Sequence, residues 1–301
     1  MKISYIVEQA EFYETYEIQT SILNYTTPEK EFRVCRYCNS PNSTFKSRAH
    51  LIPEFTGNKD SFCFNECDAC NNKFGIYETH LSAFSGIKNT FIPIKGKKNF
   101  PKFKDKNITT QFVGENRVVA KVETDANNMS LENGVLTVKA STQSFIPLYV
   151  YKALTKFGLS MLSSDDIWKF EKAIDWLSVP DKKFDDNNLP LLLIHNEGRP
   201  PILKPLAFLA KRKQDVNSPE FTFILAYGFH RLQIFLPFNS NDQNLNSEVF
   251  LPLNFDFVTQ KMKNKPQWGF GHFEMNWLEK VRLDDNFKIN FKPSENNALF
   301  K

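Results

Sequence analysis

Apolar residues recur at helical spacing directly after residue 68, and this is the clearest periodic pattern in the chain. They stand at positions i, i+3, i+7 and i+10 and are Phe74, Tyr77, Leu81 and Phe84. Because this spacing places them on one face of a helix, we expect a helix that begins between Asp68 and Cys70. Residues 45–52 favour a strand that ends at Pro53, and the turn-forming residues within 55–65 predict a loop.

Periodic patterns elsewhere predict further strands and two more helices. β-favouring and polar residues alternate between Tyr16 and Thr20, which predicts a short strand in an extended N-terminal segment. Apolar residues at helical spacing predict core-packing helices at 148–162 and 167–177. The other expected strands are 108–113, 117–122, 134–138, 191–195, 202–209, 221–227, 231–238 and 249–253.

Turn signals and the order of the elements define the organisation of the chain. Glu132-Asn133-Gly134 has the chemistry of a hairpin turn, and we expect a second turn at 228–231. A short helix is expected at 276–281. Together these elements indicate the α+β class. The expected parts are an N-terminal extension (1–30), a module that contains the first helix (31–92), and a mixed α+β C-terminal domain (93–301).

The composition is that of a folded chain. Apolar residues make up 41% of the 301 residues, enough for a sizeable core. The net charge of +4 permits nucleic-acid binding without arguing for it. Most of the five cysteines stand in closely spaced pairs, which favours a metal site in a reducing compartment over disulfides. Because no apolar run has the length of a signal peptide or a membrane span, we expect a cytoplasmic protein with no membrane partner.

Two Cys-x-x-Cys pairs give the strongest chemical signal. Cys35 and Cys38 form the first pair, and Cys67 and Cys70 form the second. Two thiolates separated by two residues can face one cation, and two such pairs complete a tetrahedral Zn²⁺ site. Such a site is coordinatively full, so we expect the zinc to stabilise the fold rather than to perform chemistry. Cys63 could replace Cys67 through a wider spacing, although a buried free thiol is the commoner case.

The residues between and after these pairs resemble a known family. In order they are Ala49-His50-Leu51-Ile52-Pro53-Glu54, then Gly57-Asn58, then Asn71 directly after the second pair, then Phe74-Gly75. Over residues 31–90 the chain resembles the zinc-stapled HNH endonucleases of the treble-clef (ββα-metal) kind, in an HNN variant.

The resemblance implies a role for each residue of the motif. His50 would be the general base that activates water. Asn58 or Asn65 would orient the histidine or its loop. Asn71 would help to hold a divalent cation, Mg²⁺ or Mn²⁺, on the scissile phosphate.

The chain departs from the family immediately before the expected general base. Many members carry Asp or Glu there as a metal ligand, whereas this chain has Ala49. Because Mg²⁺ prefers oxygen ligands, another carboxylate must serve. Glu78 is the first candidate, since it lies seven residues after Asn71 on the same face of the expected helix. Glu54 and Asp68 are the other candidates.

The most basic stretch of the chain directly follows the module, between residues 88 and 106. Its lysines could neutralise backbone phosphates, which contributes affinity without sequence readout. The expected contacts with DNA are Lys95, Lys97, Lys98 and Lys102. A solvated linker explains the same composition equally well.

The remaining histidines show no spacing that indicates a second catalytic centre. His80, near the end of the expected helix, is interpreted as a surface or capping residue. His195, His230 and His272 are interpreted as structural.

The predicted function is that of a metal-dependent endonuclease that hydrolyses phosphodiester bonds in DNA. The C-terminal domain would select the substrate, or a regulatory protein or signal ligand, as in an effector of bacterial defence. The alternative is a zinc-stabilised scaffold that binds nucleic acid or a partner with weak or absent catalysis, and Ala49 is its main support.

Overall fold

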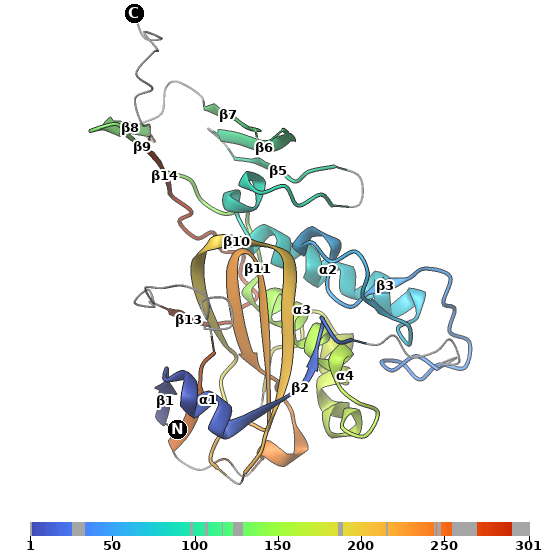
Figure 1. The fold of residues 1–301 in the computed structure, drawn as a ribbon. Helices are drawn as coiled ribbons and strands as arrows, with labels where there is room; N and C mark the ends of the chain where they lie inside the picture. The colour runs from blue at the N-terminus through green and yellow to red at the C-terminus, as the bar shows by residue number, and fades with distance from the viewer. Residues whose placement is uncertain are drawn as a thin grey trace, which may run out of the picture.

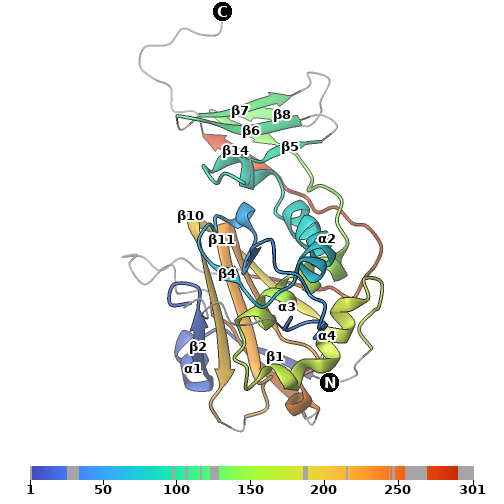
Figure 2. The same cartoon turned by 90° about the vertical axis from the view of Figure 1, so that its right-hand side faces the viewer.

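The computed structural model describes residues 2–25, 34–96, 99–105, 108–115, 117–122, 129–185, 189–214, 216–243, 245, 248–254 and 270–290. They form both helices and strands, as expected for the α+β class. Two long strands stand at the centre, and the larger helices cover one face of them (Figure 1). Small sheets lie beyond one end of the long strands, as the view turned by 90° also shows (Figure 2).

The central sheet is built on β10 (Leu192–Arg212) and β11 (Phe221–Phe235), which pair antiparallel. β13 (Gly271–Glu274) and β2 (Tyr16–Ser21) also pair with β10. The expected turn at 228–231 is wrong, because β11 continues through it. The expected strand pairs on either side of 196–201 and 228–230 are therefore single long strands.

Buried Arg231 explains why the chain continues as a strand at this point. The ladder shifts register near Ile202, whose partner is Gly228 with a φ of 52°. The Arg231 guanidinium donates to the carbonyl oxygens of Gly198 (2.8 Å), Phe229 (2.8 Å) and Pro200 (3.1 Å). These bonds satisfy carbonyl groups that the irregular ladder leaves without cross-strand donors.

Three helices pack beside the long strands: α2 (Asp68–Phe84), α3 (Pro147–Met161) and α4 (Glu171–Ser178). The α2 prediction is confirmed, since its buried residues include all four of the predicted apolar positions. α3 is buried along its whole length and lies between α2 and the sheet. The helix expected at 167–177 is divided into η3 (Ile167–Phe170) and α4.

The remaining elements frame this core. The N-terminal segment contains a helix that the sequence pattern did not predict, α1 (Gln9–Thr15), between β1 and β2. The other bounds are β1 (Lys2–Ile6), β3 (Ala49–His50), η1 (Glu54–Thr56), β4 (Phe62–Cys63), η2 (Ile87–Phe91), β5 (Lys102–Lys104), β6 (Ile108–Gly114), β7 (Arg117–Val122), β8 (Met129–Glu132), β9 (Val135–Val138), η4 (Ser240–Asp242), β12 (Glu248–Pro252) and β14 (Phe287–Asn290).

Outside the central sheet the short strands pair locally, except for two pairings that join distant parts of the chain. β5–β6–β7 and β14–β9–β8 form separate antiparallel sheets. The predicted β8–β9 hairpin is confirmed, with Asn133 and Gly134 both at positive φ, as a type I′ turn requires. β14 joins β9 from the far end of the chain, and β1 pairs parallel with β12.

Two further expectations are corrected. The strand expected at 45–52 is reduced to Ala49–His50. The helix expected at 276–281 is absent, because Asn276 bonds to the backbone of Phe184 through both its amide oxygen (2.8 Å) and its amide nitrogen (2.9 Å). Val281 then exchanges backbone hydrogen bonds with Phe145. These partners hold the segment extended.

A single buried cluster joins the segment that contains the cysteine pairs to α3, α4 and the central sheet. The expected module (31–92) therefore shares its core with the residues that follow it. No described helix combines the length and the apolar character that a membrane span needs.

Candidate metal centre and the His50 loop

The four cysteines of the two pairs meet in space. The sulfur atoms of Cys35, Cys38, Cys67 and Cys70 all lie within 4.8 Å of one another, and the Sγ atoms of Cys38 and Cys67 are 3.8 Å apart. A tetrahedral zinc with Zn–S bonds of 2.3 Å places its sulfurs about 3.8 Å apart, so the cluster is compatible with a structural zinc site. Cys63 lies outside this group as a buried free thiol.

Backbone groups support the cysteine cluster as a metal site. The amide of Cys67 donates to Cys35 Sγ, and the amide of Cys70 donates to Cys67 Sγ, each at 3.4 Å. A hydrogen bond from the Cys70 thiol lowers the pKa of Cys35 to about 4 and raises that of Cys70. Cys35 therefore loses its proton more readily than Cys70. The resulting thiolate is the form of cysteine that binds zinc.

The first turn of α2 is fastened to the loop before His50. The Asp68 carboxylate accepts hydrogen bonds from Thr44 Oγ1 (2.6 Å), from the amide of Lys46 (3.0 Å), and from the amide and hydroxyl of Ser47 (2.8 and 2.5 Å). The hydrogen bonds from Ser47 and Thr44 hold the pKa of Asp68 well below its usual range. Its oxygens therefore anchor this loop, which makes Asp68 the least suited of the three carboxylates to bind a second cation.

His50 lies on a two-residue ladder between the cysteine pairs. β3 pairs antiparallel with β4, so that His50 faces Phe62 across the ladder and their rings are 4.8 Å apart. Its neighbour Ala49 points to the opposite side and is buried in the core. The His50 side chain remains 25% exposed, which leaves the imidazole accessible to a ligand.

Asn58 holds the loop between β3 and β4 in place. It is buried, its side-chain nitrogen donates to the carbonyls of Ile52 (2.7 Å) and Ser61 (2.9 Å), and its oxygen accepts the Ser61 amide (3.1 Å). Preceding it, Gly57 has a φ of 103°, and a Cβ there would lie 2.3 Å from the carbonyl oxygen of Leu203 on β10. Glycine is needed at 57 for both reasons.

Glu54 is the carboxylate that lies beside His50. Its Oε1 is 3.7 Å from His50 Nε2 and 3.5 Å from Lys59 Nζ. Glu78, the first choice from sequence, instead lies 3.8 Å from the ammonium group of Lys156 on α3. Burial raises the pKa of Glu78.

Lys156 ties three parts of the site to α3. Its ammonium group is buried, lies 2.9 Å from Glu66 Oε2, and donates to the carbonyl oxygen of His50 at 3.4 Å. Burial lowers the pKa of Lys156, but attraction to Glu66 and Glu78 outweighs this effect and raises the pKa overall. Burial raises the pKa of Glu66. The sequence pattern gave α3 only a packing role and did not identify this lysine.

The two remaining motif asparagines lie at either side of the second cysteine pair. Asn71 is half-buried in the first turn of α2, where its amide donates to the Cys67 carbonyl. Asn65 accepts a hydrogen bond from the Cys63 thiol at 3.3 Å through its side chain. Asn58, rather than Asn65, is thus the asparagine that spans the His50 loop.

Part of the basic stretch approaches the same loop. Lys59 Nζ donates to the carbonyl of Lys95 at 2.7 Å, and the same ammonium group is 3.5 Å from Glu54. Lys102 is exposed on β5. The other two expected DNA contacts, Lys97 and Lys98, lie outside the described residues.

The remaining histidines have definite partners. His80 accepts the Ile146 amide at 2.9 Å, so it caps the start of α3, and burial lowers its pKa. His195 and His230 are brought within 3.2 Å of each other, a contact that the sequence analysis did not foresee. Only the register of their two strands places these histidines side by side, and that register follows only once β10 is known to pair with β11. His272 is exposed on β13, and its ring stacks on that of Tyr5 with the ring centres 5.3 Å apart.

No protein-family model, curated protein or solved structure matches this chain.

Proposed function

We propose that the chain is a metal-dependent endonuclease of the HNH type, with a treble-clef module, that hydrolyses phosphodiester bonds in DNA. One observation carries the proposal. His50 lies on the ladder between two cysteine pairs whose sulfur atoms are placed to hold one zinc, and a carboxylate, Glu54, lies 3.7 Å from its imidazole. A histidine of ordinary core packing has neither the exposed ring edge nor the adjacent acid.

The roles follow from the surroundings of each residue. His50, as a neutral imidazole, takes a proton from water while the water oxygen bonds to phosphorus and the bond to the leaving oxygen breaks. Asn58 positions His50 by fixing its loop. When bound, Mg²⁺ or Mn²⁺ would supply charge stabilisation for the pentacoordinate phosphorus and the leaving group. Glu54, Asn71 and Glu78 are the candidate oxygen ligands of that cation.

The environment of Ala49 supports assigning the acid role to another residue. Ala49 is 2% exposed and packs in the core cluster. A carboxylate at that position would be buried among apolar side chains, which is strongly unfavourable without a partner. Glu54 provides a carboxylate on the accessible side of the same loop.

A second candidate function is favoured by the ligand count. Within the described residues, no group of three His, Cys, Asp or Glu ligands includes His50. The zinc-stabilised segment would then be a scaffold that binds nucleic acid or a partner without cutting. In either case, the residues after 92 would select the substrate or respond to a regulatory protein or signal ligand, as in a defence effector.

Plasmid cleavage by the wild type, His50→Ala and His272→Ala, with Mg²⁺, Mn²⁺ or EDTA, tests the proposal. We expect His50→Ala to keep zinc, fold and DNA binding but to lose about 10² to 10⁴-fold in rate, because a general base contributes that much. His272→Ala, at an exposed histidine, should cut like the wild type. DNA binding without cleavage by the wild type would support the scaffold, and cleavage by His50→Ala at the wild-type rate would remove the mechanism.

A further inference from the structure

Two histidines and a glutamate meet on one face of the central sheet, in a place that the proposed nuclease site does not use. His195 and Glu197 are two residues apart on β10, so their side chains point to the same face. The cross-strand partner of Glu197 on β11 is His230. The ligand atoms of all three residues lie within 4.8 Å of one another.

The two imidazoles have the spacing of metal ligands. His195 Nε2 and His230 Nδ1 are 3.2 Å apart. Two imidazole nitrogens bound to one metal at 2.0–2.1 Å lie about 2.9 to 3.4 Å apart, depending on the coordination angle.

A backbone carbonyl fixes the orientation of the more buried ring. His230 Nε2 is 3.0 Å from the carbonyl oxygen of Ser85, the residue directly after α2, and a carbonyl oxygen only accepts hydrogen bonds. His230 Nε2 therefore carries the proton, and Nδ1 presents its lone pair towards His195. Metal-binding histidines are held by such a bond from the second ring nitrogen.

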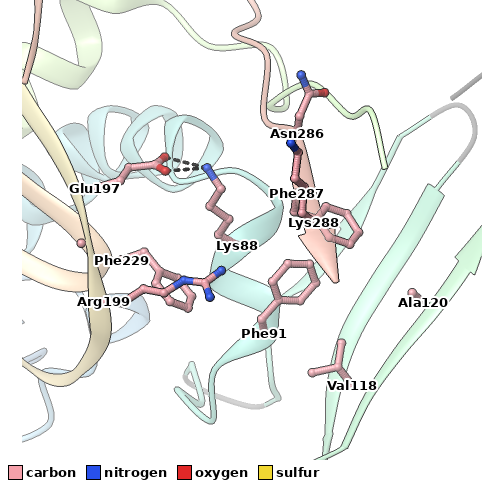
Figure 3. A pocket seen from close by; sticks show the side chains of 11 residues that line it. Lys88, Phe91, Val118, Ala120, Glu197, Arg199, Phe229, Asn286, Phe287 and Lys288 are labelled. Atoms are coloured by element: carbon pink, nitrogen blue, oxygen red, sulfur yellow. Dashed lines mark hydrogen bonds and ion pairs between the residues drawn. The ribbon is translucent and has the colours of Figure 1, made fainter. Parts of the chain in front are cut away.

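The charges around Glu197 leave it able to bind a cation. Its carboxylate is 2.6 and 2.8 Å from Lys88 Nζ, and Lys88 is also 3.2 Å from Asp285 Oδ1. Figure 3 shows this ion pair at the wall of a neighbouring cavity, whose lining includes Lys88 and Glu197 but not the two histidines. Glu197 and Asp285 thus share one ammonium group. Lys88 would therefore keep Asp285 as its partner if Glu197 bound a metal.

Space for further ligands adjoins the three residues. A cavity of about 500 Å³ is lined by His195, Glu197 and His230 together with Phe84, Phe273 and Asp285. Coordination positions that the protein does not fill would face this cavity, where water or an anionic small molecule can complete the shell.

We propose that His195, His230 and Glu197 bind one divalent transition-metal ion, at a site separate from the four-cysteine centre. Two imidazoles and one carboxylate suit Zn²⁺, Mn²⁺, Fe²⁺, Co²⁺ or Ni²⁺ rather than Ca²⁺ or Mg²⁺. Cys70 stands at the start of α2 and Ser85 at its end, so about 20 Å of helix separates the two sites. The two sites are therefore too far apart to share one metal ion.

The test is a titration of the full chain with Co²⁺ after its cysteine centre has been filled with zinc. Calorimetry counts the ions, and absorption spectra report the ligands, because cobalt bound to thiolates shows strong sulfur-to-metal bands and cobalt bound to imidazole and carboxylate does not. We expect one further equivalent without sulfur bands. His195→Gln and Glu197→Gln should each weaken its binding at least about 10-fold, whereas His272→Gln should bind like the wild type.

Each result decides the proposal. Failure of the wild type to take up a further ion would mean that the histidines form only a hydrogen-bonded pair. Uptake that both variants leave unchanged would place the ion elsewhere. The Glu197 side chain is 43% exposed, so Glu197→Gln should fold and keeps the test valid if His195→Gln does not fold. None of these readouts depends on DNA cleavage.

Discussion

Charged side chains are buried at the points where distant segments of the chain meet. Lys156 on α3 contacts Glu66 and the carbonyl of His50, and Lys152 on the same helix donates to the carbonyls of Trp176, Val179 and Pro180 at the end of α4. Burial lowers the pKa of Lys152 to about 7. Apolar periodicity predicts the helix but not these roles, since a lysine in a helical pattern is ordinarily assigned to the solvent face.

Removing the Lys156 ammonium group should destabilise the protein severely. Lys156→Met leaves Glu66 buried without its counter-charge, which typically costs about 3–5 kcal/mol. The double variant Lys156→Met/Glu66→Met removes both charges and should regain most of that loss. The measurement is urea unfolding of wild type, both variants and the exposed-site control Lys172→Met. A double variant as unstable as the single one would show that the lysine acts through packing rather than charge.

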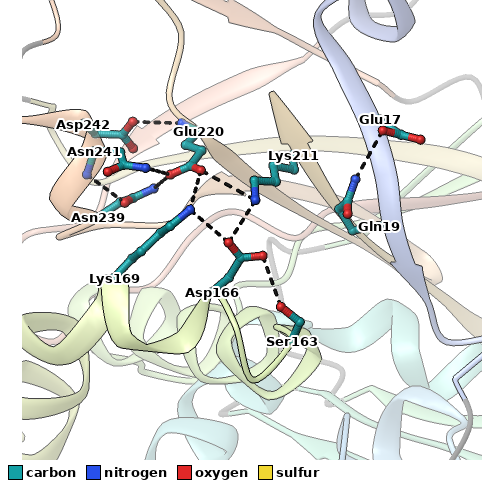
Figure 4. A network of polar contacts seen from close by, with 10 residues as sticks. All are labelled: Glu17, Gln19, Ser163, Asp166, Lys169, Lys211, Glu220, Asn239, Asn241 and Asp242. Atoms are coloured by element: carbon teal, nitrogen blue, oxygen red, sulfur yellow. Dashed lines mark hydrogen bonds and ion pairs between the residues drawn. The ribbon is translucent and has the colours of Figure 1, made fainter. Parts of the chain in front are cut away.

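A second buried network fastens β11 to the segment after it (Figure 4). Glu220 lies 2.8 Å from Lys169 Nζ and accepts hydrogen bonds from the side chains of Asn239 and Asn241. Asp242 accepts the Glu220 amide at 2.9 Å. Burial raises the pKa of Asp242 to about 7, because the single described hydrogen bond does not offset the loss of hydration.

Stability should therefore fall with pH across the range set by Asp242. The folded protein holds this proton up to about pH 7, whereas the unfolded chain releases it near the ordinary pKa of 3.8. The favourable contribution is complete below the unfolded pKa and is lost as the pH rises through the folded pKa. Asp242→Asn keeps the acceptor without the charge, so its stability relative to the wild type should rise by about 1 to 3 kcal/mol from pH 4 to pH 8.

Denaturant unfolding at pH 4, 6 and 8 measures this difference. Asp175→Asn, at an exposed position on α4, controls for the change in net charge. A constant difference between Asp242→Asn and the wild type at all three pH values would contradict the assignment.

Among the elements, α2 is predicted from sequence and the long strands are not. The four apolar positions of α2 share one face, and local periodicity is enough to define such a helix. In β10 and β11, Pro200 and Gly228 are typical chain breakers. The strands continue because Arg231 supplies the hydrogen bonds that the ladder lacks there, and this depends on tertiary contacts that no local pattern contains.

The cysteine centre should be needed for the fold of the segment that carries α2. Its thiols and Asp68 hold the start of α2 against the loop before His50, and the structure offers this loop little regular secondary structure of its own. Zinc removal by a strong chelator should therefore unfold this segment, with loss of helical circular dichroism and a lower melting temperature.

Cysteine variants give the matched comparison. Cys70→Ser should lose the zinc of the cysteine centre and the cooperative melt, whereas Cys63→Ser, at a buried thiol outside the cluster, should retain the zinc of that centre. Zinc-free purified protein with an unchanged melt would contradict a structural metal.

At the scale of the molecule, spacing in the sequence predicts the metal centre better than it predicts the surroundings of His50. The cysteine pairs come together because each pair is local and one cation can join them. Among the described residues, the carboxylate that contacts His50 is Glu54 rather than Glu78, because the turn after Pro53 brings Glu54 back while Glu78 lies beside Lys156 on α3. Contacts of this kind depend on α3, which begins almost a hundred residues later.

Part of the basic stretch reaches the His50 loop, where Lys59 donates a hydrogen bond to the Lys95 carbonyl. Lys102 and Lys104 are exposed on β5, with Phe103 buried between them, so both ammonium groups project from one face. If this face contacts backbone phosphates, Lys102→Glu/Lys104→Glu should weaken DNA binding about equally for all sequences and flatten its salt dependence.

The control variant Lys172→Glu/Lys182→Glu makes the same charge change on the exposed side of α4 and in the loop that follows it. Fluorescence anisotropy over a range of salt concentrations measures both variants. Equal salt slopes for wild type and the β5 variant would identify this stretch as a solvated linker, and DNA would then have to approach His50 from another side.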